Sequence, residues 1–188
     1  FGKFQYVYTE RNAFNPYKFD IEPIIEKMEE HSGEHAVLGL PYGIHNPDGR
    51  LIPNEAMDQI VLAAAEHDVH LVSDQVYGDE TPREVKKYSP THALRKLPQE
   101  EKISKDKQVN ITTVVTYSKN LIVPGSRGAT VHTADPQEVA YLVSKRDIAQ
   151  INPLASVILA ALTENRDRTQ KMILNPAIKE IDFRKKFV

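Results

Sequence analysis

Ionisable and polar side chains follow the short apolar runs of this chain, and their types are suited to acid–base and nucleophilic chemistry. Lys119 has an amine that can attack an electrophile or carry a proton, and Asp74 has a carboxylate that can balance a positive charge. Tyr77 offers a phenol, and Arg127 a guanidinium suited to phosphate. We predict one site built from side chains of these kinds, namely His45, Asn46, Asp74, Tyr77, Ser118, Lys119 and Arg127.

Short segments rich in apolar and β-branched residues predict the strands that position these side chains, at 36–40, 69–72, 109–115 and 129–132. After the first strand, Asn54 is predicted to cap a helix whose apolar residues recur at helical spacing, at Ala56, Met57, Ile60, Val61 and Ala64. A strand, a helix and a strand joined by short links build a parallel sheet. Two more helices are predicted, at about 136–148 and 154–165.

These elements predict the α/β fold class, with a mostly parallel sheet flanked by helices. A ligand of such an open sheet binds beyond the carboxyl ends of the strands, which is where the polar side chains lie. We expect residues 1–188 to form a single domain. Residues 81–107 hold 12 charged side chains among 27 and show little periodicity, so we predict a charged loop excursion from the sheet. The simplest interpretation is a solvated loop, and the functional one is a lid or a subunit contact.

The composition is that of an ordinary globular protein of 188 residues with a formal net charge of -2. This balance argues against a nucleic-acid or membrane partner, which would favour a basic excess. The chain has no cysteine and therefore no disulfide or thiolate chemistry, and a reducing, cytoplasmic location is the simpler expectation. No apolar run approaches the roughly 18 residues that span a bilayer. Because the chain begins at Phe1, we expect that its amino terminus was processed, excised or left out.

Four motifs, in order and at fitting separations, resemble those of the fold-type I pyridoxal-phosphate (PLP) enzymes, the class I/II aminotransferase family. They are His45-Asn46-Pro47-Asp48-Gly49-Arg50, Ser73-Asp74-Gln75-Val76-Tyr77, Thr116-Tyr117-Ser118-Lys119 and Pro124-Gly125-Ser126-Arg127-Gly128. Gln75 stands where the family usually has glutamate, and Thr116 where it usually has serine. The resemblance covers the central part of the PLP-dependent transferase-like large domain, so we expect that domain to be incomplete. The branch that looks closest is the aminocyclopropane-carboxylate synthase-like one.

The resemblance implies pyridoxal 5'-phosphate as the cofactor and assigns roles around its ring. Lys119 resembles the lysine that forms a Schiff base with the cofactor and then moves the Cα proton as a general acid and base. Asp74 would face the pyridine nitrogen and keep it protonated, so that the ring remains an electron sink. Tyr77 and Asn46 would donate hydrogen bonds to the phenolate oxygen.

The same resemblance assigns the phosphate of the cofactor to Arg127, with the hydroxyls of Thr116 and Ser118, through charge-assisted hydrogen bonds. The implied function is an aminotransferase that acts on amino acids and keto acids through Lys119, as a homodimer. An alternative in the same family is a lyase or synthase that performs elimination or ring closure. An alternative from another class is a truncated, non-catalytic remnant of the fold that serves as a binding or assembly module.

Taken singly, each motif has an ordinary structural interpretation. Asn46-Pro47-Asp48-Gly49 favours a turn, Asp74 could cap the end of a strand, and an isolated lysine such as Lys119 is usually a solvated surface residue. Only the joint order and spacing of the motifs favour the family. Two histidine pairs have no clear metal-ligand spacing, so we expect surface residues and no metal site: His31 with His35, and His67 with His70.

Overall fold

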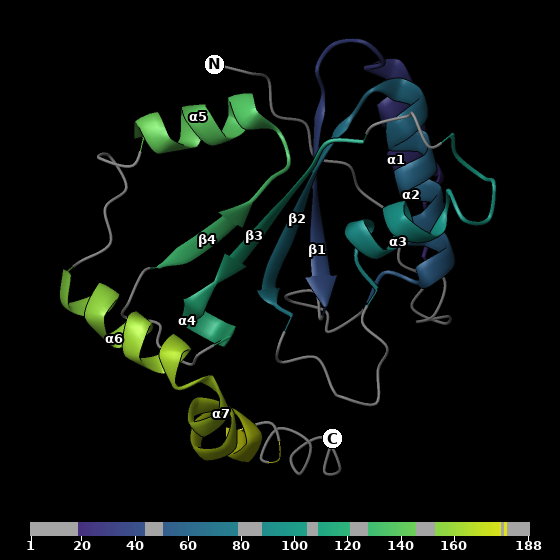
Figure 1. The fold of residues 1–188 in the computed structure, drawn as a ribbon. Coiled ribbons are helices and arrows are strands. Elements are labelled where there is room, and N and C mark those ends of the chain that lie inside the picture. Colours follow the sequence, from purple (N-terminus) through teal and green to yellow (C-terminus); the bar gives the residue numbers. More distant parts are fainter. Residues whose placement is uncertain are drawn as a thin grey trace. The chain divides into compact units, whose positions relative to one another are not determined.

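The computed structural model describes residues 19–43, 51–78, 88–104, 109–120, 128–145, 153–177 and 179. Within these ranges four strands form one sheet in the order β1-β2-β3-β4: β1 (Val37–Gly43), β2 (His70–Tyr77), β3 (Ile111–Thr116) and β4 (Ala129–His132). The arrows of β1, β2 and β3 point the same way in Figure 1, whereas β4 is antiparallel to β3, with Thr116 opposite Ala129. This mixed sheet with flanking helices confirms the predicted α/β fold class.

The chain divides into two compact units. The first takes its described residues from Phe1–Leu40, Ile52–Val72 and Tyr88–Ile111, and the second from Pro41–Leu51, Ser73–Lys87 and Thr112–Val188. The division falls within β1, β2 and β3, so that the carboxyl-terminal residues of these strands belong to the second unit. The described site residues therefore all lie in the second unit.

The core of the first unit forms around α2 (Asn54–His67), whose apolar residues Met57, Ile60, Val61 and Ala64 are almost completely buried. The helix is confirmed near its predicted start, but Asn54 does not cap it. The N-cap position is Pro53, without a side-chain hydrogen bond, and Asn54 is the first helical residue. Asn54 was predicted as the N-cap because asparagine is a favoured capping residue. In the structure the residue before it, Pro53, has the extended backbone of an N-cap, with φ of -58° and ψ of 149°. The helix ends at Asp68, which adopts a left-handed conformation.

Two shorter helices accompany α2 in this unit. The first, α1 (Glu22–Glu30), buries Ile24 and Met28, which are one turn apart and pack into the same core cluster. The second, α3 (Pro90–Lys96), lies within residues 81–107, so the loop prediction is wrong for this stretch. A helix of seven residues is too short to show hydrophobic periodicity. The sequence marks this helix only locally, by a capping serine, Ser89, directly before a proline. In the structure Ser89 accepts a hydrogen bond from the His92 backbone N–H in a capping box.

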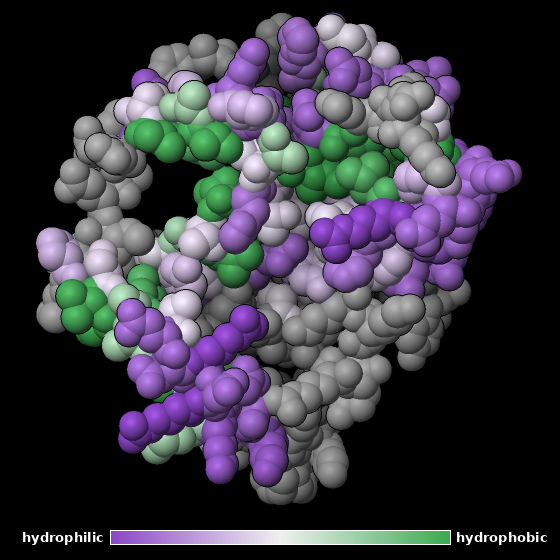
Figure 2. Space-filling view, in the orientation of Figure 1, coloured by the Kyte–Doolittle hydropathy of each residue, from purple (hydrophilic) through white to green (hydrophobic). Residues whose placement is uncertain are grey.

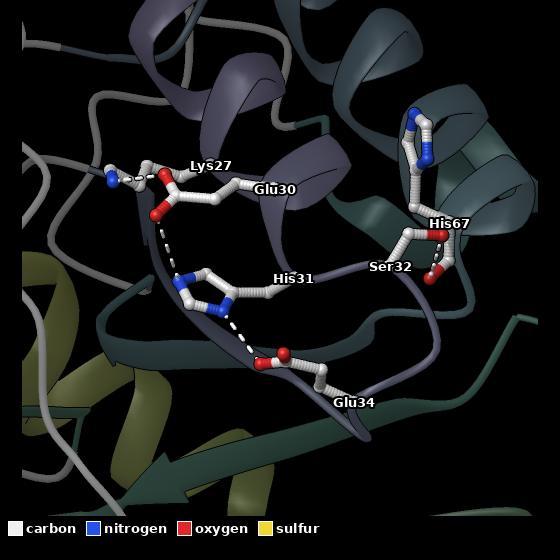
Figure 3. A network of polar contacts seen from close by, with 6 residues as sticks. All are labelled: Lys27, Glu30, His31, Ser32, Glu34 and His67. Atoms are coloured by element: carbon white, nitrogen blue, oxygen red, sulfur yellow. Dashed lines mark hydrogen bonds and ion pairs between the residues drawn. The ribbon is translucent and has the colours of Figure 1, made fainter.

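The end of α1 carries a polar network that also reaches the end of α2 (Figure 3). Lys27 donates a hydrogen bond to Glu30, which lowers the pKa of that carboxyl. The His31 ring lies between Glu30 and Glu34, with Nδ1 2.8 Å from Oε2 of Glu34. Ser32 donates to the backbone carbonyl of His67 at 3.5 Å, which is a last-turn acceptor of α2. Among the described residues, no group of three or more potential metal-ligating side chains comes together.

A second polar cluster joins α2 to α3 and is part-buried. Asp58, only 8% exposed, accepts a hydrogen bond from the Tyr88 hydroxyl at 2.5 Å and from Lys96 Nζ at 2.6 Å. Lys96 Nζ also lies 5.7 Å from the centre of the Tyr88 ring. Burial, and then the hydrogen bond to Asp58, raises the pKa of Tyr88 to about 12. The hydrogen bond to Asp58 also raises the pKa of Lys96.

The raised pKa of Tyr88 predicts a loss of stability in alkali. A group whose pKa is higher in the folded state stabilises the protein fully below its unfolded value, here 10, and loses that contribution as the pH rises toward about 12. We therefore expect the difference in melting temperature between wild type and Tyr88→Phe to be constant below pH 10 and to shrink between pH 10 and 12. Thermal unfolding followed by circular dichroism at intervals across this range would measure it. A difference that stays constant to pH 12 would contradict the assignment.

The second unit contains β4 and the helices that follow it, α5 (Pro136–Lys145) and α6 (Pro153–Glu164), at the predicted positions, then α7 (Arg166–Thr169) and a π-helical turn (Gln170–Leu174). The buried Thr112 of β3 donates to the carboxylate of Glu138, which lies in the first turn of α5. Several large apolar side chains of α5 and α6 are exposed, namely Val139, Tyr141, Val143, Val157 and Ile158. Green surface appears over these two helices in Figure 2. No helix in the described part of the chain combines the length and hydropathy needed to cross a membrane.

Candidate functional site at the ends of β2 and β3

Five of the predicted site residues lie on two neighbouring strands and on the turn that follows one of them. Asp74 and Tyr77 belong to β2, and Thr116 is the last residue of β3. Ser118 and Lys119 lie in the short helix α4 (Tyr117–Asn120), which begins directly after β3. Because β2 and β3 are adjacent and point the same way, these residues lie toward one edge of the sheet (Figure 1). His45, Asn46 and Arg127 lie outside the described residues.

The structure brings Lys119 and Tyr77 together. The Nζ atom of Lys119 lies 5.6 Å from the centre of the Tyr77 ring, within the range of a cation–π contact. Tyr77 is half-buried at the end of β2, and Lys119 is exposed. Lys119, predicted from the sequence as the reactive amine, therefore lies beside Tyr77, predicted as a cofactor ligand.

Among the described residues, three hydrogen bonds hold the turn that carries Lys119. The Thr116 hydroxyl accepts from the Ser118 backbone N–H at 3.3 Å and donates to the Gly128 carbonyl at 3.4 Å. The Tyr117 backbone N–H donates to the same carbonyl at 3.0 Å. Gly128 directly follows Arg127, the predicted phosphate ligand. These contacts therefore connect the turn that carries Lys119 to the residue next to Arg127.

Asp74 lies inside a strand and not beyond its end, which corrects the predicted strand of 69–72. β2 continues to Tyr77, and the exposed Asp74 follows the fully buried Ser73. The strand was predicted too short because Ser73, Asp74 and Gln75, which continue it, are polar. Oδ1 of Asp74 accepts a hydrogen bond from the Val76 N–H at 3.0 Å. Among the described residues, no hydrogen bond or ion pair joins Asp74 to Lys119.

Three further residues near Asp74 and Tyr77 were not proposed for the site from the sequence, namely Tyr42, Gly78 and Ser73. Tyr42, near the end of β1, packs against Gly78, where an added Cβ would lie 3.3 Å from the Tyr42 ring. A glycine directly after a strand that ends in an aromatic residue was the available signal for this close approach. The third is Ser73, whose hydroxyl is fully buried and has no hydrogen-bond partner among the described residues. The sequence includes Ser73 in the motif Ser73-Asp74-Gln75-Val76-Tyr77, but nothing in it indicates that the hydroxyl is buried.

The mixed sheet with flanking helices is similar to the fold of the PLP-dependent aminotransferase large domain, as likeness to solved structures shows. A PLP-bound protein of Clostridium difficile 630, assigned as an aminotransferase, is 20% identical, with a TM-score of 0.70 over 95% of this chain and 43% of its own. The PLP-bound C-S lyase of Staphylococcus hominis is 18% identical, with a TM-score of 0.69 over 95% and 42%. A tetra mutant of Thermus thermophilus aspartate aminotransferase is 21% identical, with a TM-score of 0.61 over 85% and 39%.

The chain belongs to the aminotransferase class I and II family, whose family model matches residues 2–181. This match confirms the family that the four motifs predicted. Among curated proteins, none matches the sequence. The chain spans about two fifths of the length of the solved structures named above.

Proposed function

We propose that this chain provides the lysine-bearing part of a PLP-dependent enzyme that transfers amino groups between amino acids and keto acids. The observation that carries the proposal is the position of Lys119 Nζ over the Tyr77 ring, where two adjacent strands end. Membership of the class I and II family supports it. The PLP bound to two of the similar structures supports the choice of cofactor.

The side chains at this edge of the sheet fit the chemical groups of pyridoxal phosphate. A primary amine suits its aldehyde, and a carboxylate suits its pyridine nitrogen, as in Lys119 and Asp74. The hydroxyls of Thr116 and Ser118, on the turn that carries Lys119, are of the kind that bind a phosphate. Both carboxylate and amine are exposed, and therefore accessible to a ligand.

The proposal assigns a role to each of the predicted site residues. Lys119 is the residue that would hold the cofactor through its amine, and it would move the proton of the substrate Cα. Asp74 keeps a proton on the ring nitrogen, and Tyr77 and Asn46 donate to the phenolate oxygen. Arg127, Thr116 and Ser118 bind the phosphate. The bound cofactor supplies an electron sink for the pair left when the Cα–H bond breaks.

Borohydride reduction tests the proposal directly. We expect that pyridoxal phosphate followed by borohydride leaves one adduct per chain on Lys119, which peptide mass mapping would locate, and that Lys119→Ala loses it. Lys145→Ala is the matched control, because Lys145 Nζ also lies over a tyrosine ring, at 5.4 Å from that of Tyr141, but on α5. Labelling spread over surface lysines, or unchanged in Lys119→Ala, would contradict the proposal.

A second candidate reaction, elimination or ring closure, uses the same residues. The likeness to a C-S lyase supports it as an alternative to transamination. Keto-acid formation that does not need an acceptor keto acid would favour elimination.

The aminocyclopropane-carboxylate synthase-like branch, a homodimer and a cytoplasmic location remain predictions. The exposed apolar residues of α5 and α6 support the homodimer. A non-catalytic remnant would form no adduct on Lys119.

A further inference from the structure

We propose that Tyr42 is a positioning residue for Tyr77. Its ring packs against Gly78 and holds the end of β2 in the place from which the Tyr77 ring meets Lys119. The inference rests on the proposed function, because that function gives Lys119 the reactive role. Neither Tyr42 nor Gly78 belongs to the site residues predicted from the sequence. All four residues lie in the second unit.

Gly78 lies against one edge of the Tyr42 ring. A Cβ atom added at Gly78 would lie 3.3 Å from Cε1 and 3.4 Å from Cδ1 of Tyr42, which is tighter than most contacts of a Cβ atom. It would also lie 3.5 Å from the Gln75 carbonyl oxygen. Gly78 is buried and directly follows Tyr77, the last residue of β2. A residue without a side chain therefore lets the backbone come this close to the ring without displacing it.

Gly78 also closes a turn that contains Tyr77. Its N–H donates a hydrogen bond to the Gln75 carbonyl at 3.3 Å, so that Gln75 to Gly78 form a turn at the end of β2. β1 and β2 are neighbours in the sheet, and Tyr42 is the last residue but one of β1. The Tyr42 ring therefore meets this turn from the adjacent strand and restricts the movement of Gly78. Because Tyr77 is covalently joined to Gly78, the restriction extends to Tyr77.

The position of Tyr77 matters because its contact with Lys119 joins two different elements. Nζ of Lys119, on α4, lies 5.6 Å from the centre of the Tyr77 ring. A cation–π contact requires the face of the ring to be turned toward the amine. Without the Tyr42 ring the end of β2 gains conformational freedom, and the entropy of fixing Tyr77 opposes the contact. The Lys119 amine then spends less time over the ring.

Proton NMR of Lys119 tests this contact in the protein without cofactor. Protons over an aromatic ring resonate upfield, so we expect the Hε protons of Lys119, resolved by selective 13C-lysine labelling, to be displaced upfield. Tyr77→Leu would abolish the displacement. We expect Tyr42→Ala to reduce it roughly two- to fivefold, the factor that the free energy of an exposed cation–π contact allows. Tyr42→Phe keeps the ring and should match wild type. Lys145 is the internal control, because its Nζ lies 5.4 Å from the centre of the Tyr141 ring on α5 and its resonance should not move.

Gly78→Ala tests the same contact from the other side. The added methyl group must displace the Tyr42 ring or the Gly78 backbone, so the upfield displacement should fall in this variant as well. In the double variant with Tyr42→Ala the methyl group finds space, so the second substitution should add no further loss. Losses that simply add in the double variant would overturn the proposal. So would an unchanged displacement in a folded Tyr42→Ala, or in Gly78→Ala if Tyr42→Ala does not fold.

Borohydride labelling separates a failure of this inference from a failure of the proposed function. Pyridoxal phosphate and borohydride are added to the full chain of wild type, Tyr42→Ala and Tyr42→Phe, and the Lys119 adduct is followed by mass. A positioning role predicts that labelling of Lys119 slows several-fold in Tyr42→Ala and not in Tyr42→Phe. Equal rates in all three would overturn it. If wild type gives no Lys119 adduct, the proposed function fails, and the Lys119 resonance still decides the role of Tyr42.

Discussion

Replacing Asp58 with alanine is expected to lower the free energy of unfolding by about 2 kcal/mol, because it removes an acceptor of two hydrogen bonds from a nearly buried position. Most of this loss comes from the Tyr88 bond, because the Lys96 side chain is 40% exposed and its ion pair is screened by water. For a chain of this size, the melting temperature would fall by roughly 4–8 °C. Thermal or urea unfolding would measure the change.

Glu66→Ala is the control for the loss of Asp58, because it removes an exposed carboxylate from the same helix, α2. Its effect is expected to stay within about 0.5 kcal/mol. If both variants unfold at the wild-type midpoint, the cluster of Asp58, Tyr88 and Lys96 does not hold α3 against α2. If Asp58→Ala alone is destabilised, charge loss in general is not the cause.

The second large effect is expected at Asp74, where asparagine removes the charge and keeps the shape. An asparagine Oδ1 can still accept the hydrogen bond from the Val76 N–H, so the local backbone should not change. In the proposed site, the ring nitrogen of the cofactor would then lose its partner charge. We expect Asp74→Asn to slow the pyridoxal-phosphate-dependent exchange of an amino acid Cα hydrogen with deuterium by about 100-fold. Proton NMR of the amino acid in deuterated water would follow it.

The chain offers a close control for this measurement in Asp135. Its Oδ1 accepts from the N–H two residues later, that of Gln137, at 2.8 Å, the same local contact as in Asp74. Asp135→Asn should leave the exchange rate unchanged. Equal rates in wild type and Asp74→Asn would remove Asp74 from the proposed site, and equal loss in both variants would point to a general effect of the substitution.

The sequence predicted well those elements whose residues repeat an apolar pattern over a sufficient length. The long α2 and the β-branched β3 are such elements. Short elements were missed, because α3 and α4 span only seven and four residues, and a capping serine or a turn leaves no periodic pattern. β2 was predicted too short, because its second half is polar and only the hydrogen bonds of the sheet extend it to Tyr77.

The sequence proposes residues for the candidate site, but it does not predict the contacts between them. The order of Asp74, Tyr77 and Lys119 indicated the family, and strand ends indicated the edge of the sheet. That Lys119 lies over the Tyr77 ring depends on the pairing of two strands far apart in the sequence. That the Thr116 hydroxyl bonds to Gly128 depends on the register of β3 with β4. Neither relation can be read from residue types.

The apolar side chains that α5 and α6 expose have a practical consequence for solution work on this chain. Tyr141 of α5 is 62% exposed and Val157 of α6 is 67% exposed, so both helices present apolar side chains to water. Sulfate and phosphate salts strengthen apolar association because they are excluded from protein surfaces. In such buffers the chains would associate through these helices and precipitate as the protein concentration rises. Dilute samples in chloride salts would keep the labelling and exchange measurements free of precipitation.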